Sequence, residues 1–284
     1  MDAVDEARKS EEAEAFIRRV EELKQLRERM ERVRYKVAVM SGKGGVGKSL
    51  VTVNLAVVLT SEGKKVGVLD ADLHGPTVPK MLGLKGARLE VGDNGIIPPM
   101  SPSRIKVASM DFLLPSQDSP VIWRGPLKMA AIRQLLTDID WGELDYLLID
   151  LPPGTGDESL TVLQLLPGID GVVIVTMPNE VSGQVVEKSI SFVRQLKAPV
   201  IGVIENMSFL ICPHCGERID LFGGGVAERV ASEMGVPFLG SIPLEPKIAQ
   251  NSDSGTPFVA ENPDSPAAKA FIGIVAEIER FVKL

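Results

Sequence analysis

Cysteine, net positive charge and long apolar runs are what this sequence lacks. Only two of its 284 residues are cysteine, too few for a secreted disulfide framework and too few for one chain to complete a four-thiolate metal site. No apolar run reaches the roughly 18 residues of a membrane-spanning helix, and the first residues lack the apolar stretch of a signal peptide. We therefore expect a cytoplasmic protein with no membrane partner.

The charge balance is acidic, with 31 basic and 38 acidic residues and a formal net charge of −7. This balance argues against broad attraction to nucleic acid, so we expect no nucleic-acid partner. Hydrophobic residues make up 44% of the chain, which is enough to bury a substantial core without disulfides. Residues 1–36 are rich in both signs of charge but neutral, so the net charge belongs to the rest of the chain.

The sequence pattern changes near residue 35 and divides the chain into a charged N-terminal helix, residues 1–34, and a single domain, residues 35–284. Within the helix a thin apolar stripe recurs at three- and four-residue steps, formed by Phe16, Val20, Leu23, Met30 and Val33. Such a helix either lies solvated on the domain or provides a short partner-binding or dimer contact. The sequence leaves both interpretations open.

Short apolar runs rich in β-branched residues alternate with longer helical patterns from Val37 onward. Continuous apolar strands separated by helices predict an α/β fold, with a mostly parallel β-sheet and helices on both faces. Ligands of such sheets bind beyond the carboxyl ends of the strands. The predicted strands are residues 37–41, 66–70, 105–109, 146–150, 172–176, 200–205 and 238–242.

A glycine-rich segment directly after the first strand fits the pattern G-x-x-x-x-G-K-[ST]. Its glycines leave room for backbone N–H groups around phosphate oxygens, and the helix that follows points its positive end at the same anion. Lys48 is expected to reach the β- and γ-phosphates, and Ser49 to ligate Mg²⁺. The pattern predicts a P-loop NTPase that binds ATP and Mg²⁺ through Gly42, Lys43, Gly44, Gly45, Val46, Gly47, Lys48 and Ser49.

Aspartates end two of the predicted strands. Asp70 ends the second strand with Asp72 two residues further on, and Asp150 ends the fourth, directly before Leu-Pro-Pro-Gly. Carboxylates beside a phosphate loop hold Mg²⁺ or orient the attacking water, although Asp70 and Asp72 are equally typical of residues that open a turn. The loop at residues 152–153 is a candidate γ-phosphate sensor. His74, near the two aspartates, is a further catalytic candidate.

The two cysteines stand in one short motif, Cys212-Pro-His-Cys215-Gly. The two-residue spacing lets both sulfurs face one ion, and Gly216 permits the positive φ that such a turn often needs. This metal knuckle at residues 212–215 fills half of a tetrahedral Zn²⁺ site or of a [4Fe–4S] cluster, and a symmetric dimer would supply the other half. A redox dithiol and a plain surface turn are alternatives, and thiolates alone do not select iron over zinc. His214 is expected to be exposed.

Longer motifs resemble one protein family. Residues 120–126, PVIWRGP, and residues 141–157, WGELDYLLIDLPPGTGD, are similar to the Mrp/ApbC family of iron–sulfur cluster carrier ATPases, and the resemblance covers about residues 35–260. Lys43 also gives the phosphate loop the deviant form KGGVGKS of a dimerising ATPase class that includes MinD-type proteins. The resemblance implies a slow ATPase that forms a homodimer, binds a labile [4Fe–4S] cluster through its cysteines and transfers it to apo iron–sulfur proteins.

The same resemblance implies roles for individual residues. Lys43 would reach across the dimer to the partner's nucleotide, in the manner of an arginine finger, and would act in catalysis together with Lys48. Asp72 would position the attacking water, and Asp70 would belong to the outer shell of the Mg²⁺ site. Asn206 resembles the residue that reads the adenine edge, since an amide both donates and accepts. A solvated loop lysine and a plain cap or turn residue are the alternatives for Lys43 and Asn206.

Other functions remain open at this stage. A MinD/ParA-like positioning ATPase would carry no cluster, a zinc-bridged dimeric ATPase would hold zinc in the same cysteines, and a thiol oxidoreductase would not need nucleotide. The C-terminal helix at residues 267–284 has an apolar stripe, but its polar face has fewer basic residues than a membrane-lying helix would show. We therefore expect this helix to pack on the domain. Some relatives carry four more cysteines near the N-terminus for a second cluster, which this chain lacks.

Overall fold

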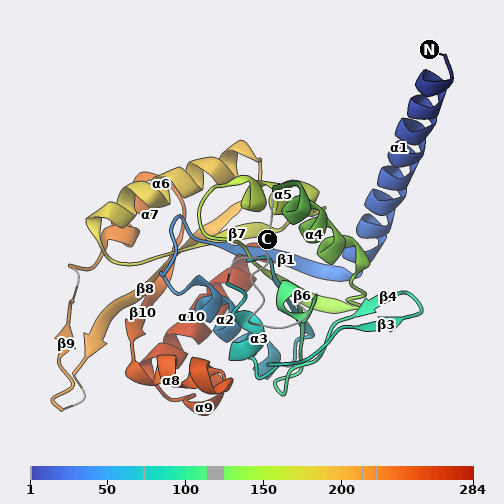
Figure 1. Ribbon diagram of the computed structural model, residues 1–284. Helices are drawn as coiled ribbons and strands as arrows, with labels where there is room; N and C mark the ends of the chain where they lie inside the picture. Colours follow the sequence, from blue (N-terminus) through green and yellow to red (C-terminus); the bar gives the residue numbers. More distant parts are fainter. Residues whose placement is uncertain (1, 73–74, 114–124, 213, 222) are drawn as a thin grey trace.

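A parallel β-sheet lies at the centre of the molecule, with helices on both of its faces (Figure 1), as predicted. The computed structural model describes residues 2–72, 75–113, 125–212, 214–221 and 223–284. His74 and most of the motif at residues 120–126 lie outside these ranges. The strands are β1 Val33–Met40, β2 Val66–Asp70, β3 Glu90–Gly92, β4 Gly95–Ile97, β5 Ile105–Ser109, β6 Leu144–Asp150, β7 Gly171–Thr176, β8 Val200–Ile211, β9 Arg218–Ile219 and β10 Phe238–Leu244.

Helices precede, connect and follow these strands. They are α1 Asp2–Met30, α2 Lys48–Ser61, α3 Val78–Met81, η1 Met110–Leu113, α4 Gly125–Asp138, α5 Asp157–Leu165, α6 Glu180–Gln195, α7 Val226–Glu233, α8 Pro246–Ser254, α9 Phe258–Glu261 and α10 Pro266–Val282. One core contains residues of α2, α3, α8, α9 and α10. The other contains residues of α4, α5, α6, α7 and the end of α1.

The order of strands in the large sheet is β10-β8-β7-β1-β6-β2-β5, and β9 pairs with β8 at one end. These strands are parallel except for β9. Along β1, Val37 and Val39 enter one core while Ala38 and Met40 enter the other. Burial on both faces explains why the sequence shows continuous apolar runs instead of alternation.

The two terminal helices pack differently. In α10 the apolar stripe is buried as far as Ile278, with Phe271 fully covered, which confirms that the helix packs on the domain. In α1 the last turns are buried at Leu26 and Met30, but Phe16 and Leu23 are exposed, and the helix extends away from the body (Figure 1). Within the described residues, no helix is long and apolar enough to cross a membrane.

The predicted boundary at residues 34 and 35 lies inside β1, because the strand begins at Val33. Val33 pairs with Leu144 at the start of β6 and is buried. The prediction that Val33 belongs to the apolar stripe of the helix was therefore wrong, because Val33 begins the central strand instead. Sheet pairing with β6 outweighs the helical spacing at this position.

Candidate functional site: a phosphate loop and a cysteine turn

The phosphate loop joins the central strand β1 to helix α2. Gly47 caps α2 with a left-handed φ of 82°. A Cβ atom at Gly47 would lie 2.3 Å from Asn206 Nδ2, and one at Gly42 would lie 2.1 Å from Val185 Cγ1 on α6. These two glycines are therefore required by close packing, in addition to any contact with phosphate.

Asp150 is the centre of a buried polar network at the end of β6. Its carboxylate lies 2.7 Å from Lys48 Nζ. It accepts hydrogen bonds from Ser49 Oγ at 2.6 Å and from Thr52 Oγ1 at 2.7 Å. Asp150 is fully buried, so these donors replace the water that its charge would otherwise need. The structure thus brings together the predicted Lys48, Ser49 and Asp150.

Asp70 lies beside Asp150, because the two residues are register partners on β2 and β6. Burial raises the pKa of Asp70 well above its ordinary value, and the neighbouring Asp150 raises it further, while Lys48 lowers it. Ser109 Oγ lies 3.3 Å from the carboxylate of Asp70. Asp70 thus sits in the interior of the site, and its charge is strongly disfavoured there.

Asp72 differs from Asp70 although only one residue separates them. β2 ends at Asp70, and the backbone N–H of Asp72 donates to Asp70 Oδ1 at 3.1 Å. This is the Asx-type turn that the sequence allowed as an alternative. Asp72 is half-buried and lines the cleft described below, so the turn presents its side chain where a ligand would bind.

Lys43 and Asn206 lie at two sides of the phosphate loop. Lys43 Nζ lies 3.4 Å from Asn179 Oδ1, and Asn179 also caps α6 by accepting from the backbone N–H of Ser182. Asn206 is buried and donates from Nδ2 to the carbonyl of Val46 at 2.9 Å. The sequence indicated neither contact, since each joins segments more than a hundred residues apart.

An open cleft of about 460 Å³ lies over the phosphate loop. Among the predicted site residues, Gly44, Gly45, Val46, Gly47, Lys48, Ser49 and Asp72 line it. Gly42, Lys43, Asp70, Asp150 and Asn206 do not. Its remaining lining comes from the loops and helices around it: Ser41, Leu50, Gly75, Thr77, Met81, Pro153, Met207, Ala249, Ser252 and Asp253.

The cysteines lie on a tight turn that follows β8. The backbone N–H of Cys212 donates to Glu217 at 2.9 Å, and that of Gly216 donates back to Cys212 at 2.9 Å. Gly216 has a φ of 74°, as the motif predicted, and His214 is exposed as expected. Cys212 is half-buried and Cys215 exposed. The turn therefore presents both thiols near the surface.

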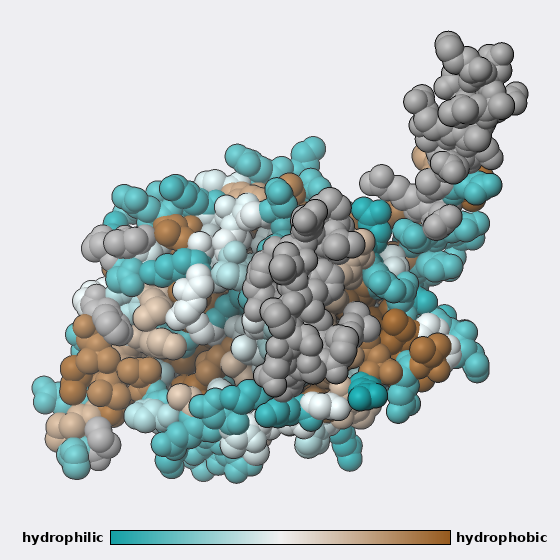
Figure 2. All heavy atoms as spheres, in the orientation of Figure 1, coloured by the Kyte–Doolittle hydropathy of each residue, from teal (hydrophilic) through white to brown (hydrophobic). Residues whose placement is uncertain are grey.

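Hydrogen-bond donors surround the sulfur of Cys212. The backbone N–H of Cys215 lowers the pKa of Cys212 most, followed by the backbone N–H of His214 and the thiol of Cys215. These donors favour the thiolate, which is the form that binds metal. Figure 2 shows apolar residues gathered over the same hairpin, where Ile219 and Leu221 are exposed.

Comparison with known proteins places this chain. Residues 32–279 match the family model ParA, described as the NUBPL iron-transfer P-loop NTPase. The chain belongs to this family. It is 52% identical over 255 residues to an iron–sulfur cluster carrier protein of Saccharolobus solfataricus, covering 90% of this chain and 86% of that one. It is 53% identical over 253 residues to a protein of the same name from Methanocaldococcus jannaschii, covering 89% and 87%.

Solved structures agree with this family assignment. A nucleotide-binding protein from Archaeoglobus fulgidus, in complex with ADP, is 45% identical and aligns with a TM-score of 0.74 over 82% of this chain and 91% of that one. The septum site-determining protein MinD from Pyrococcus horikoshii is 24% identical, with a TM-score of 0.64 over 87% and 96%. The second likeness shows the fold, a P-loop NTPase fold of the MinD type.

Several residues of the site were not found from the sequence. Thr52 follows Lys48 by four residues, so helical spacing alone could have placed it beside Asp150. Asn179 and Met207 carry no such signal. Met207 lines the cleft with a φ of 55°, a conformation that is uncommon for a residue with a side chain.

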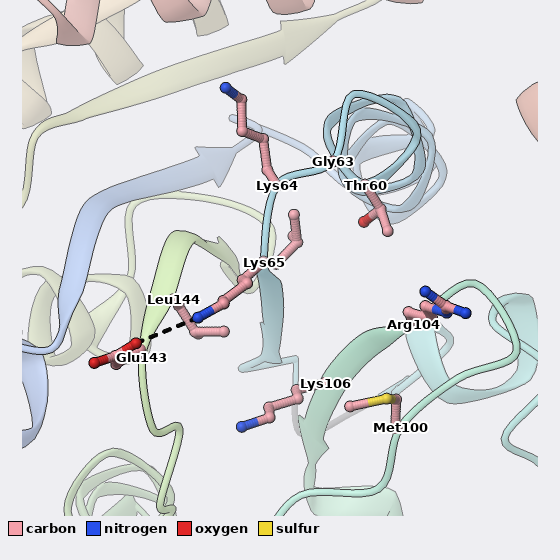
Figure 3. A pocket seen from close by; sticks show the side chains of 10 residues that line it. Thr60, Gly63, Lys64, Lys65, Met100, Arg104, Lys106, Glu143 and Leu144 are labelled. Carbon is pink, nitrogen blue, oxygen red and sulfur yellow. Dashed lines mark hydrogen bonds and ion pairs between the residues drawn. The ribbon is translucent and has the colours of Figure 1, made fainter.

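A second cavity, of about 580 Å³, lies at the opposite end of the sheet, near the starts of β2 and β6. Figure 3 shows its cationic lining. Lys65 pairs with Glu143 at 3.3 Å, and Lys106 Nζ donates to the carbonyl of Trp141 at 2.7 Å. Lys64 Nζ lies 3.8 Å from Glu279. Among the described residues, none of the predicted site residues lines this cavity, and its three lysines already have partners.

Proposed function

We propose that this protein is an ATP-binding and ATP-hydrolysing carrier that holds a labile [4Fe–4S] cluster between two copies of the chain and delivers it to apoproteins. The observation that carries the proposal is the turn at Cys212 and Cys215. In a chain of the iron-transfer NTPase family, it presents two thiols near the surface, and backbone donors favour the thiolate of Cys212. Its place of action would be the cytosol, where thiols stay reduced.

Nucleotide would bind in the cleft over the phosphate loop. The backbone of residues 42–47 and the ammonium of Lys48 would hold its phosphates. Ser49 would ligate Mg²⁺, with Asp150 and Asp70 in the surrounding shell, and Asp72 would orient the attacking water. These are hard oxygen donors, as Mg²⁺ requires, and the hydroxyl of Ser49 already lies 2.6 Å from Asp150.

Two further residues would complete the nucleotide site. Lys43 would leave Asn179 and reach the nucleotide of the partner protomer, where its charge would stabilise the transferred phosphoryl group. Asn206 would contact the adenine through its amide, whose nitrogen uses one of its two hydrogens in the bond to Val46. The domain from residue 35 to 284 would thus act as one ATPase unit with α1 as an appendage.

The cluster is cargo, and the cysteine turn fits half of it. Each protomer offers Cys212 and Cys215, and a two-fold dimer would bring four thiolates to one cluster. Delivery would exchange these thiolates for those of the recipient without net electron transfer. The same four sulfurs would also accept Zn²⁺.

Anaerobic reconstitution with iron and sulfide tests the proposal. We expect one cluster for each dimer, with the broad visible absorption of a [4Fe–4S] centre, and transfer of that absorption to an apo acceptor on mixing. Cys212→Ala should abolish iron binding while ADP binding is retained, and Ser254→Ala serves as a matched surface control. Full iron binding by Cys212→Ala would refute the assignment, and zinc bound in preference to iron would replace it with the zinc-bridged alternative.

A second measurement tests the ATPase assignment by itself. Wild-type protein should release phosphate from ATP slowly, and Asp72→Asn should abolish the release while leaving ADP affinity intact, because Asp72 would act on the water and not on the nucleotide. Hydrolysis at the wild-type rate in Asp72→Asn would remove that residue from the mechanism.

A further inference from the structure

One strand joins the nucleotide cleft to the cysteine turn. β8 carries Asn206 against the phosphate loop and Met207 into the cleft. Cys212 follows Met207 by five residues, directly beyond the end of β8 at Ile211. At about 3.3 Å per residue this is a span of roughly 16 Å. Figure 1 shows β8 running from the sheet to the hairpin that it forms with β9. The two sites are therefore connected by one continuous piece of backbone.

That strand is irregular between the two sites. Asn206 pairs with Ile242 of β10, and the next pair along is Leu210 with Leu244. From one pair to the next, the chain advances four residues along β8 but only two along β10. The extra residues form a β-bulge in β8, and this bulge includes Met207. The left-handed φ of 55° at Met207 lies within the bulge. A residue with a side chain rarely adopts this region, so surrounding contacts must hold it in place.

A buried carboxylate provides those contacts. Glu205 is fully buried and accepts hydrogen bonds from Ser208 Oγ and from the backbone N–H of Ala227, the latter at 3.1 Å. Ser208 is buried as well. Glu205 and Ser208 lie on either side of Asn206 and Met207, and Ala227 lies in the first turn of α7. These three residues, called here the β8 latch, clamp the bulge and fix it to α7.

The bulge also contacts the phosphate loop, through the hydrogen bond from Asn206 to Val46. Asn206 Nδ2 lies 2.3 Å from the point where a Cβ at Gly47 would be, and Met207 Cε lies 3.5 Å from the same point. The phosphate loop therefore has no free space on this side. A shift of Gly47 toward β8 when phosphate binds would therefore press on Asn206, and we expect the strand to carry that movement toward Cys212.

We propose that the β8 latch couples nucleotide occupancy of the cleft to the conformation of the cysteine turn. Glu205 and Ser208 are positioning residues: they touch neither nucleotide nor cargo, and they define how the bulge between the two sites is set. The coupling rests on the nucleotide-binding part of the proposed function and needs no cluster. By reciprocity, occupancy of the cysteine turn would change nucleotide affinity by the same factor.

The alkylation rate of the two thiols measures this coupling in the metal-free protein. Iodoacetamide labelling at neutral pH, followed by mass spectrometry of the peptide that contains residues 212–215, is compared with and without saturating Mg²⁺–ADP. We expect nucleotide to change the rate about fivefold. In Ser208→Ala the ratio should fall close to one, while saturating ADP still binds, because Ser208 itself does not line the cleft.

A matched control separates coupling from general loosening. Thr137 is also buried, and its hydroxyl bonds within α4, away from β8, so Thr137→Ala should keep the wild-type ratio. A wild-type ratio of one, or an unchanged ratio in Ser208→Ala, would overturn the proposal. If Ser208→Ala does not fold, hydrogen exchange of residues 203–212 in wild-type protein decides: unchanged exchange on adding ADP refutes the coupling.

Failure of the β8 latch and failure of the proposed carrier function can be told apart. A protein that binds a cluster normally but shows no nucleotide effect on its thiols would refute the latch and leave the carrier function standing. A protein whose thiols respond to ADP but which takes up no iron would refute the carrier function alone.

Discussion

Three glycines of the phosphate loop form a graded series that tests the packing between the loop and β8. Gly44 has open space at its Cβ position and no left-handed φ. Gly45 has a φ of 78° but also open space, and Gly47 has a φ of 82° together with the overlap on Asn206. Alanine therefore adds neither strain nor a clash at Gly44, backbone strain alone at Gly45, and both strain and a steric clash at Gly47.

The expected losses of unfolding free energy follow from these differences. Gly44→Ala should change stability by less than about 0.5 kcal/mol. Gly45→Ala should cost about 1–2 kcal/mol for left-handed alanine. Gly47→Ala should cost about 2–4 kcal/mol, because the displaced Asn206 amide also loses its bond to Val46 and leaves buried polar groups without partners.

Urea unfolding without nucleotide, followed by circular dichroism, measures these changes, and an unchanged m-value shows that the unfolded state is the same. The double variant Gly47→Ala/Asn206→Ala sharpens the test. Truncating Asn206 removes the clash, so its cost in the Gly47→Ala background should be much smaller than in wild type. Equal losses for Gly45→Ala and Gly47→Ala, or strict additivity in the double variant, would refute the contact.

Three further predictions concern the charged groups. Asp150→Asn should destabilise the nucleotide-free protein by about 3 kcal/mol in urea unfolding, because Lys48 is left buried without its partner. ADP should restore part of this loss, and no loss of stability would contradict the buried polar network around Asp150. Because the pKa of Asp70 is raised on folding, the folded state holds a proton that the unfolded state releases. The unfolding free energy in a chelating buffer should therefore fall as pH rises above about 4. Asp70→Asn should flatten this decline, and an equally steep decline in the variant would count against the raised pKa. Because the pKa of Cys212 is lowered, its alkylation should reach half-maximal rate at a pH below the pKa of an ordinary cysteine thiol. Cys215→Ala should raise that midpoint pH only in part, since the backbone donors remain. A wild-type midpoint at or above the ordinary pKa would contradict the hydrogen bonds to Cys212.

The sheet could be predicted from the sequence because both of its faces are covered. Strands in that environment are almost wholly apolar, so their runs are visible without any knowledge of tertiary contacts. The hairpin of β3 and β4 was not predicted, because strands of three residues leave too short a pattern. β8 was predicted only to residue 205, because the polar residues Glu205 and Asn206 interrupt its apolar run while the strand continues to Ile211.

The candidate site divides in the same way. The phosphate loop, Asp150 and the cysteine motif have local patterns whose chemistry requires those residue types at that spacing. The bond from Lys43 to Asn179 and the clamp on Glu205 join segments that lie far apart or depend on how a strand bends. Asp70 and Asp72 look equivalent in the sequence. They differ in the structure because β2 ends at Asp70, which leaves Asp70 buried and Asp72 accessible.

The position of β8 in the sheet has a consequence for local unfolding. Its first half, to Glu205, is paired on one side with β7 and on the other with β10. Its last residues are paired with the two-residue strand β9 and the end of β10. The amide protons of one strand should therefore exchange with solvent at very different rates, slowly near Val203 and rapidly near Ile211. The hairpin could open and close many times while the phosphate loop, anchored on the central strand, stays folded.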